Sequence, residues 1–258
     1  MVAYIFIQAP LIFSAEPIPI ELKDVGIEEH LGTQISLDRS FLNEENKKVF
    51  LKDFFHQKRP IVLTLVYYRC PNLCHFLLDG FTEVLKKLSW TAGTEFDIVT
   101  ISIDPTETAA LSLEKKKHRL EVYGRNQAEK GWHFLTGEES AIQALAREVG
   151  FQYRYDPDQK QYAHAAGIFI LTPEGKISRY LYGISFRPLD LKLALLEAAQ
   201  GKIGNVVDKF LLFCYHYDPK GRKYSIFARN LMSFAGLITV CLVIIMLIVL
   251  SKKKMWFR

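Results

Sequence analysis

The chain has 258 residues, of which 49% are hydrophobic and 24% are charged, and its formal net charge is +5. This length and hydrophobic content allow one ordinary domain with a substantial core, and they exclude a disordered chain. Four residues of the C-terminal tail, Lys252, Lys253, Lys254 and Arg258, account for nearly all of the positive excess. Nucleic-acid binding therefore has little support.

The N-terminal fifteen residues partly resemble a secretory signal peptide. Residues 2–15 form an apolar stretch that ends in Phe-Ser-Ala and is followed by Glu16. No basic residue precedes the stretch, and Phe13 is bulky for a cleavage site that favours small side chains. We interpret residues 1–15 as a candidate signal peptide and residues 16–205 as one domain.

Hydrophobic periodicity and turn composition divide that domain into alternating strands and helices. The polar stretch at 43–48 is typical of a hairpin turn. Because strand and helix alternate between residues 60 and 103, the strands there are expected to pair in parallel. The expected strands are 60–68, 96–103, 132–136, 151–155, 165–171 and 176–182, and the expected helices are 75–89, 107–123, 138–149 and 188–200.

Two cysteines, Cys70 and Cys74, stand where the strand expected at 60–68 gives way to a helical pattern. Pro71 suits a first helical turn, and the positive end of the helix dipole favours thiolate over thiol. Residues at i and i+4 of a helix have Cβ atoms about 5–6 Å apart, whereas a relaxed disulfide needs about 3.5–4.5 Å. A metal bridges such a pair without distortion, and Cu(I) is the soft ion that most favours thiolates.

Three other interpretations of the cysteine pair are a structural disulfide, a purely redox pair and two inert buried thiols. The last is disfavoured, because a loop that contains Asn72 and is flanked by Arg69 is expected to be partly exposed. Two thiolates alone leave room for a third ligand. His164 precedes the strand expected at 165–171, and imidazole is a common copper ligand. The alternative is a loop histidine bonded to backbone.

A βαβ unit with the cysteine pair at its first helix, followed by a late hairpin and a closing helix, indicates an α/β, thioredoxin-like fold with an added β-hairpin. The chain also resembles the Sco/SenC family, copper-binding thioredoxin-like proteins involved in assembling the dinuclear copper centre of cytochrome c oxidase. The resemblance rests on Tyr68-Arg-Cys-Pro-Asn-Leu-Cys74, on Val99-Thr-Ile-Ser-Ile-Asp-Pro105, and on His164 leading into Ile168-Phe-Ile-Leu-Thr-Pro-Glu-Gly175.

The resemblance implies copper ligands at Cys70, Cys74 and His164. It also matches Asp104 to an acidic position near the site, where a hard carboxylate suits a supporting role better than direct Cu(I) binding. Many family members have proline directly after the second cysteine, whereas this chain has His75. That histidine is expected to face solvent in the first helical turn, with an added ligand or proton donor as the alternative.

The C-terminal part of the chain predicts a membrane anchor. Residues 231–250 contain no charged residue and are long enough for one transmembrane helix, with Cys241 inside it. The basic tail at 251–258 predicts a cytoplasmic C-terminus, which places the main domain on the periplasmic or extracytoplasmic side of the inner membrane as a single-pass protein. The anchor of the Sco/SenC family is usually N-terminal, so this chain looks like a C-terminally anchored subgroup.

The juxtamembrane segment at 206–230 contains Cys214 and His216, which form a C-x-H pair. An auxiliary metal or redox site is one interpretation of this pair. A structural role in an aromatic belt at the membrane surface is the more common outcome for such a pair.

Two functions follow from these motifs. The first is a membrane-anchored chaperone that carries Cu(I), with Cu(II) as a second state, to cytochrome c oxidase subunit II or another copper enzyme. The second is a thiol:disulfide oxidoreductase that reduces the cysteines of the oxidase copper site through Cys70 and Cys74. A peroxiredoxin-like peroxidase is a weaker third alternative, because only the fold supports it.

Overall fold

The computed structural model describes residues 25–55, 58–70, 73–203, 215–218 and 223–226. For Leu73, Cys74 and the two short strands after residue 214 it describes the secondary structure alone. The candidate signal peptide at 1–15, the predicted span at 231–250, the tail at 251–258, Cys214 and Cys241 lie outside the described residues. Those predictions are therefore untested by the structure.

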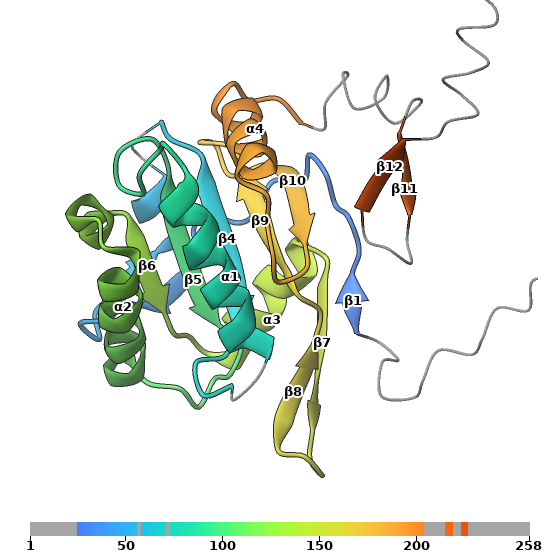
Figure 1. Ribbon diagram of the computed structural model, residues 1–258. Helices are drawn as coiled ribbons and strands as arrows, with labels where there is room; N and C mark the ends of the chain where they lie inside the picture. Colours follow the sequence, from blue (N-terminus) through green and yellow to red (C-terminus); the bar gives the residue numbers. More distant parts are fainter. Residues whose placement is uncertain (1–24, 56–57, 71–72, 204–214, 219–222, 227–258) are drawn as a thin grey trace, which may run out of the picture.

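The centre of the domain is a five-stranded sheet with the order β10-β9-β4-β5-β6 (Figure 1). Strand β4 pairs in parallel with β5, and β5 pairs in parallel with β6, while β9 is antiparallel to both β4 and β10. Every residue of β4 and β5 is buried, as their continuous apolar sequences predict. The strands are β4 (Ile61–Val66), β5 (Asp97–Ser102), β6 (Trp132–Leu135), β9 (Gly167–Leu171) and β10 (Ile177–Tyr182).

Four α-helices pack around this sheet. Figure 1 shows α1 and α2 in front of the sheet and α3 behind it, with α4 in front of β9 and β10. Helix α2 begins after Thr108, whose side chain accepts a hydrogen bond from the Leu111 amide, and it ends at Gly124, which adopts a left-handed conformation. The helices are α1 (Leu73–Lys87), α2 (Ala109–Tyr123), α3 (Glu139–Glu148) and α4 (Pro188–Ala199), with short 3-10 turns η2 (Leu51–Phe54) and η3 (Asn126–Lys130).

Smaller strand pairs complete the described part of the chain. A three-stranded sheet has the order β1-β7-β8, and its β7–β8 hairpin extends below the central sheet in Figure 1. The turn predicted at 43–48 joins β2 to β3 as expected. The remaining strands are β1 (Gly26–Ile27), β2 (Ser40–Leu42), β3 (Lys48–Phe50), β7 (Phe151–Asp156), β8 (Gln161–His164), β11 (Tyr215–Asp218) and β12 (Lys223–Ile226).

The predicted helices and strands of the main domain are confirmed, each boundary to within two residues. Strand β1, the 3-10 turns η2 and η3, and strand β8 were not predicted. Residues 161–164, expected to be a loop before the late hairpin, form strand β8 and pair with β7. His164 is therefore the last residue of a strand, opposite Tyr153 in the β7–β8 register.

The strand directions gather three distant segments at one edge of the central sheet. The parallel strands β4 and β5 end there and lead into Tyr67–Cys70 and Asp104–Glu107 respectively. Strand β9 begins there, because it runs antiparallel with Leu63 opposite Phe169. His164 lies just before β9. The topology thus brings the first cysteine, the acidic loop and the histidine to the same end of the molecule.

Among the helices of the described ranges, none is both long and apolar enough to span a membrane. The predicted anchor at 231–250 falls outside those ranges and remains a prediction.

Candidate metal centre

Cys70 lies in a turn directly after β4. Its amide donates a hydrogen bond to the Tyr67 carbonyl over 3.3 Å, and its side chain is buried, with 9% of the residue exposed. The expected partial exposure of this loop is thus correct for Arg69, which is exposed, and wrong for Cys70. The loop turns the arginine outward and the thiol inward.

Glu107 holds this turn from the opposite loop. Its carboxylate accepts hydrogen bonds from the amides of Tyr68 and Arg69, both over 2.7 Å, and from the Ser102 hydroxyl over 2.6 Å. Burial raises the pKa of Glu107, and the hydrogen bonds from Ser102, Tyr68 and Arg69 oppose that rise. Glu107 therefore fixes the backbone that enters the cysteine motif.

The sequence pattern predicts Glu107 as the first residue of the helix at 107–123, with no role at the site. Glu107 actually precedes α2, whose first residue is Ala109. A signal was present in the sequence. Glu107 follows the carboxyl end of a buried parallel strand, where loops of α/β folds carry functional side chains.

Asp104 has the supporting role that its chemistry predicted. Its Oδ1 accepts hydrogen bonds from the amide and the hydroxyl of Thr106, over 2.8 and 2.7 Å. Its own amide donates to Ser102 Oγ over 3.1 Å. Asp104 therefore orders the loop that presents Glu107 to the cysteine turn.

His164 is buried at the end of β8, with 7% of the residue exposed. Its Nδ1 lies 2.8 Å from the Ala165 carbonyl oxygen. Because a carbonyl only accepts hydrogen bonds, Nδ1 must carry the proton, and the neutral ring then has its lone pair on Nε2. Metal-binding histidines commonly have their second nitrogen held in this way. The contact with backbone and a ligand role at Nε2 are therefore compatible.

Tyr67 links the histidine to the cysteine turn. Its ring contacts the His164 ring edge to face, with centroids 6.0 Å apart, and its carbonyl accepts the Cys70 amide hydrogen bond. Phe151 packs on the same imidazole, with centroids 5.9 Å apart. The structure thus brings Cys70 and His164 to the same aromatic neighbour, although they are 94 positions apart in the sequence.

Cys74 lies in the first turn of α1, as expected. Its side chain is outside the described part of the structure, so the set Cys70, Cys74 and His164 remains a prediction. Among the side chains that are described, no group of three His, Cys, Asp or Glu residues is placed to hold a metal ion.

His75 differs from His164 in the nitrogen that is left for a ligand. Its Nδ1 lies 3.4 Å from Nη2 of Arg119, which only donates, and its Nε2 lies 3.6 Å from Asp79 Oδ2. Arg119 also pairs with Asp79 and is itself buried. These partners favour a proton on Nε2 and leave the only lone pair facing a cation. The geometry therefore favours a structural role for His75 over a ligand role.

The second predicted cluster is not tested by the structure. His216 lies in β11, of which only the backbone is described, and Cys214 lies outside the described residues.

A family model described as SCO1/SenC matches residues 29–188. The chain belongs to the SCO1/SenC family. The match includes both motif cysteines, Glu107 and His164. Membership confirms the family that the sequence motifs resembled.

Three relatives illustrate the membership. The SCO1 protein homolog of Bacillus subtilis (strain 168) is 24% identical over 186 residues, which are 71% of this chain and 81% of that protein. Arabidopsis thaliana ScoI, solved with copper bound, is 20% identical with a TM-score of 0.51, covering 63% of this chain and 96% of that one. BsSco, described as a member of the Sco family of cytochrome c oxidase assembly proteins with a disulfide switch, is 20% identical with a TM-score of 0.51, covering 67% and 96%.

Both solved structures are only 20% identical to this chain, so the comparison with them establishes its fold alone. It is the α/β, thioredoxin-like fold of the Sco proteins.

Proposed function

We propose that this protein is a copper chaperone anchored to the inner membrane by residues 231–250, with its main domain on the periplasmic side. It takes up Cu(I), with Cu(II) as a second state, on Cys70, Cys74 and His164. It delivers the ion to the dinuclear copper centre of cytochrome c oxidase, in subunit II, or to another copper enzyme. Copper is the cargo of the protein and is not a resident cofactor.

The observation that carries this proposal is the position of the His164 ring and the hydrogen bond made by its Nδ1. The Ala165 carbonyl holds the proton on Nδ1, and Tyr67 places the ring beside the turn that carries Cys70. A buried imidazole with its lone pair on Nε2 suits a soft metal held by thiolates. Family membership and a relative solved with copper bound support the same conclusion.

Delivery needs a site that exchanges its ion. Three protein ligands leave a coordination position open, so an incoming thiol or imidazole from the recipient can bind before the chaperone ligands leave. A membrane tether would raise the effective concentration of the chaperone near a recipient in the same membrane. The charge of the chain, concentrated in its basic tail, gives no support for a nucleic-acid partner.

A thiol:disulfide oxidoreductase is the second candidate. Cys74 in the first turn of α1 and Cys70 just before that helix are four positions apart, and a disulfide at such spacing is strained and therefore more oxidising. The relative BsSco is described as having a disulfide switch. Reduction of the recipient's cysteines would use Cys70 and Cys74 and would not need His164.

Two measurements on the same variants distinguish the chaperone from the oxidoreductase. Copper affinity and the rate of thiol exchange are compared for the wild type, His164→Ala and the double variant Cys70→Ser/Cys74→Ser. His30→Ala is the matched control, because His30 Nδ1 likewise faces a backbone carbonyl, that of Glu148 at 3.1 Å.

If the protein is a chaperone, His164→Ala should weaken copper binding by more than roughly a hundredfold. That is the upper cost of losing a residue that only hydrogen-bonds to a metal ligand. Thiol exchange stays near the wild-type rate, and His30→Ala changes neither quantity. Fast exchange, combined with wild-type copper binding no tighter than that of the double cysteine variant, would instead establish the oxidoreductase.

A further inference from the structure

A hollow of about 600 Å³ opens beside the cysteine turn. Tyrosine rings from three segments form its wall: Tyr67 after β4, Tyr155 at the end of β7 and Tyr162 in β8. Arg69, Asp104 and Lys160 also line it. Arg69 directly precedes Cys70, so anything bound in this tyrosine hollow lies next to the proposed copper site.

The three tyrosines form a continuous aromatic surface. The ring centroids of Tyr155 and Tyr162 are 5.1 Å apart, and those of Tyr162 and Tyr67 are 5.5 Å apart. Tyr155 is 49% exposed, a large value for an aromatic residue. Tyrosines of this kind dominate the energetics of protein interfaces.

The charges of the hollow favour an acidic partner. The structure gives Arg69 and Lys160 no ion-pair partner within the described residues. The carboxylate of Asp104 already accepts two hydrogen bonds from Thr106. Two cations and one carboxylate line the hollow, so its formal charge of +1 favours a partner with negative charge.

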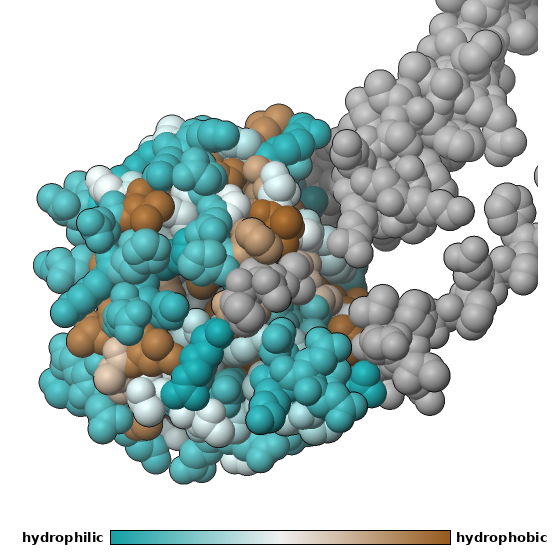
Figure 2. All heavy atoms as spheres, turned by 60° about the horizontal axis from the view of Figure 1, so that its bottom comes forward, coloured by the Kyte–Doolittle hydropathy of each residue, from teal (hydrophilic) through white to brown (hydrophobic). Residues whose placement is uncertain are grey.

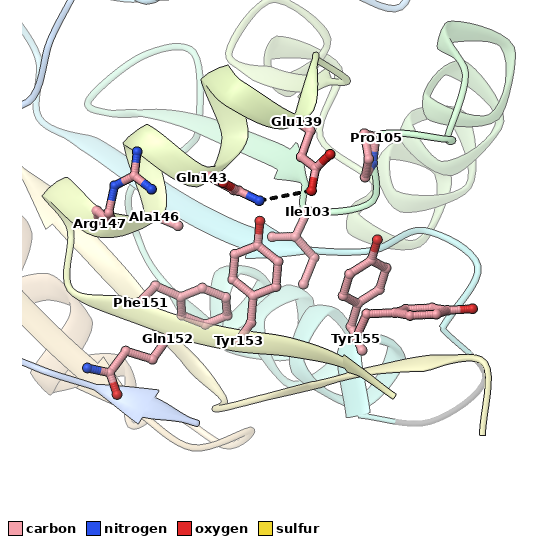
Figure 3. A pocket seen from close by; sticks show the side chains of 11 residues that line it. Ile103, Pro105, Glu139, Gln143, Ala146, Arg147, Phe151, Gln152, Tyr153 and Tyr155 are labelled. Carbon is pink, nitrogen blue, oxygen red and sulfur yellow. Dashed lines mark hydrogen bonds between the residues drawn. The ribbon is translucent and has the colours of Figure 1, made fainter. Parts of the chain in front are cut away.

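A second hollow of about 440 Å³ continues the surface toward α3. It shares Tyr155 and Tyr162 with the first, and Figure 3 shows Tyr153 projecting from β7 toward Gln143 of α3. Arg147 adds a cation to this wall and Glu139 adds a carboxylate, so the second hollow brings no net charge of its own. A depression of this length suits an extended chain segment better than a small molecule.

The surface around the site supports recognition by polar groups. The β7–β8 hairpin and the start of α1 lie at the bottom of Figure 1, and Figure 2 brings that end forward. The surface there is mostly hydrophilic, with hydrophobic residues in small separate groups. On this face, a partner finds no broad apolar area to bury, so specific aromatic and charged contacts must supply its binding energy.

We propose that the tyrosine hollow binds an extended, acidic segment of the protein that receives the copper and so sets the receiving ligands beside Cys70. This inference rests on the proposed chaperone function. Tyr155 supplies the aromatic contact and Lys160 supplies the attraction for a carboxylate.

The test uses the full-length copper-loaded protein in detergent and, as the recipient, the apo copper-binding domain of cytochrome c oxidase subunit II. The variants are Lys160→Asn, Lys160→Glu and Tyr155→Ala. Lys58→Asn is the matched control, because Lys58 and Lys160 are both exposed lysines with the same left-handed φ of 52°. Lys58 lies at the opposite end of the central sheet, just before β4.

All variants are expected to load copper as the wild type does. Lys160→Asn should slow transfer about threefold and Lys160→Glu about tenfold at low salt, because charges at the rim of an interface act mainly on association. Those differences should shrink in about 0.5 M salt, where charges are screened over a few ångströms. Tyr155→Ala should slow transfer about tenfold at any salt concentration, and Lys58→Asn should leave it unchanged.

The outcomes distinguish the two proposals. Wild-type transfer rates in both Lys160→Glu and Tyr155→Ala would overturn the tyrosine hollow as the docking site and leave the chaperone intact. A wild type that loads copper and passes none to the apo domain would overturn delivery to cytochrome c oxidase, and the docking site for that recipient with it.

Discussion

Single side chains decide the shape of the candidate site, and Glu107 is the clearest example. One buried carboxylate satisfies two backbone amides of the cysteine turn and one hydroxyl of the neighbouring strand. Buried amides left without an acceptor are costly, so the turn depends on this residue.

Glu107→Ala should lower the free energy of unfolding by about 2–4 kcal/mol, because it leaves the amides of Tyr68 and Arg69 without their acceptor. Urea denaturation measures the change. Glu121→Ala, at an exposed position of α2, should change stability by no more than about 0.5 kcal/mol. Equal effects of the two substitutions would show that the carboxylate does not support the turn.

His133 on β6 gives the fold a measurable sensitivity to acid. Burial, followed by the nearby charge of Lys116, lowers the pKa of this imidazole to about 4. Arg59 also lowers it, whereas Glu44 and the Lys130 backbone raise it. The folded state therefore excludes a proton that the unfolded chain, with a pKa of about 6.5, accepts.

Stability should consequently fall as the pH drops from about 6.5 to about 4, by up to about 3 kcal/mol from this residue. His133→Phe keeps a ring against Phe54, whose centroid lies 4.5 Å away, and removes the titration. Chemical denaturation at several pH values should then show a smaller loss toward acid in the variant. Identical losses in the two proteins would rule out His133 as the cause.

At the scale of elements, helix α1 carries one cysteine of the motif and packs against a loop that comes much later in the sequence, between β10 and α4. A Cβ atom added at Gly80 would lie 1.8 Å from the Ile184 carbonyl oxygen. The segment between β10 and α4 therefore packs directly on the α1 backbone, and only glycine allows this approach.

Gly80→Ala tests this contact. In an isolated helix the substitution would be stabilising by about 1 kcal/mol. Here the clash with backbone should outweigh that gain and destabilise the protein by about 1–3 kcal/mol, measured by thermal or urea unfolding. Lys87→Ala, on the exposed side of the same helix, should be nearly neutral. A more stable Gly80→Ala protein would contradict the close packing.

The sequence predicted most elements because their patterns are local. Strand β8 was missed because Gln161–His164 is short and has no run of β-branched residues. The turn before it folds the chain back so that it pairs with β7. In this turn Asp156 Oδ1 accepts hydrogen bonds from the amides of Asp158 and Gln159. The Asp-Pro-Asp sequence of that turn was the available signal.

The candidate ligands of the site were predicted from the sequence, but the residues that position them were not. Cys70, Cys74 and His164 could be proposed because their residue types and spacing carry chemistry. The roles of Glu107 and Tyr67 could not, because each acts through contacts with segments far away in the sequence. The burial of Cys70 was likewise hidden by its polar neighbour Arg69, which turns outward.

At the scale of the whole molecule, the described domain ends shortly after α4, and the predicted anchor lies beyond it. The full-length chain should remain with membranes after alkaline carbonate extraction, because an uncharged run of 20 residues suffices to cross a bilayer. A chain ending at Ile203 should be released into the soluble fraction on the same side of the membrane. Release of both forms would refute an anchor at 231–250.

The antiparallel pairing of β4 with β9 also orders events in time. The segment with Cys70 and the segment with His164 emerge far apart during synthesis, and this pairing joins the strands next to them. Closing so long a loop comes late, after the local helices have formed. A newly made chain that crosses a membrane unfolded would therefore arrive with the segments of Cys70 and His164 still apart, and these segments would meet only once the central sheet was complete.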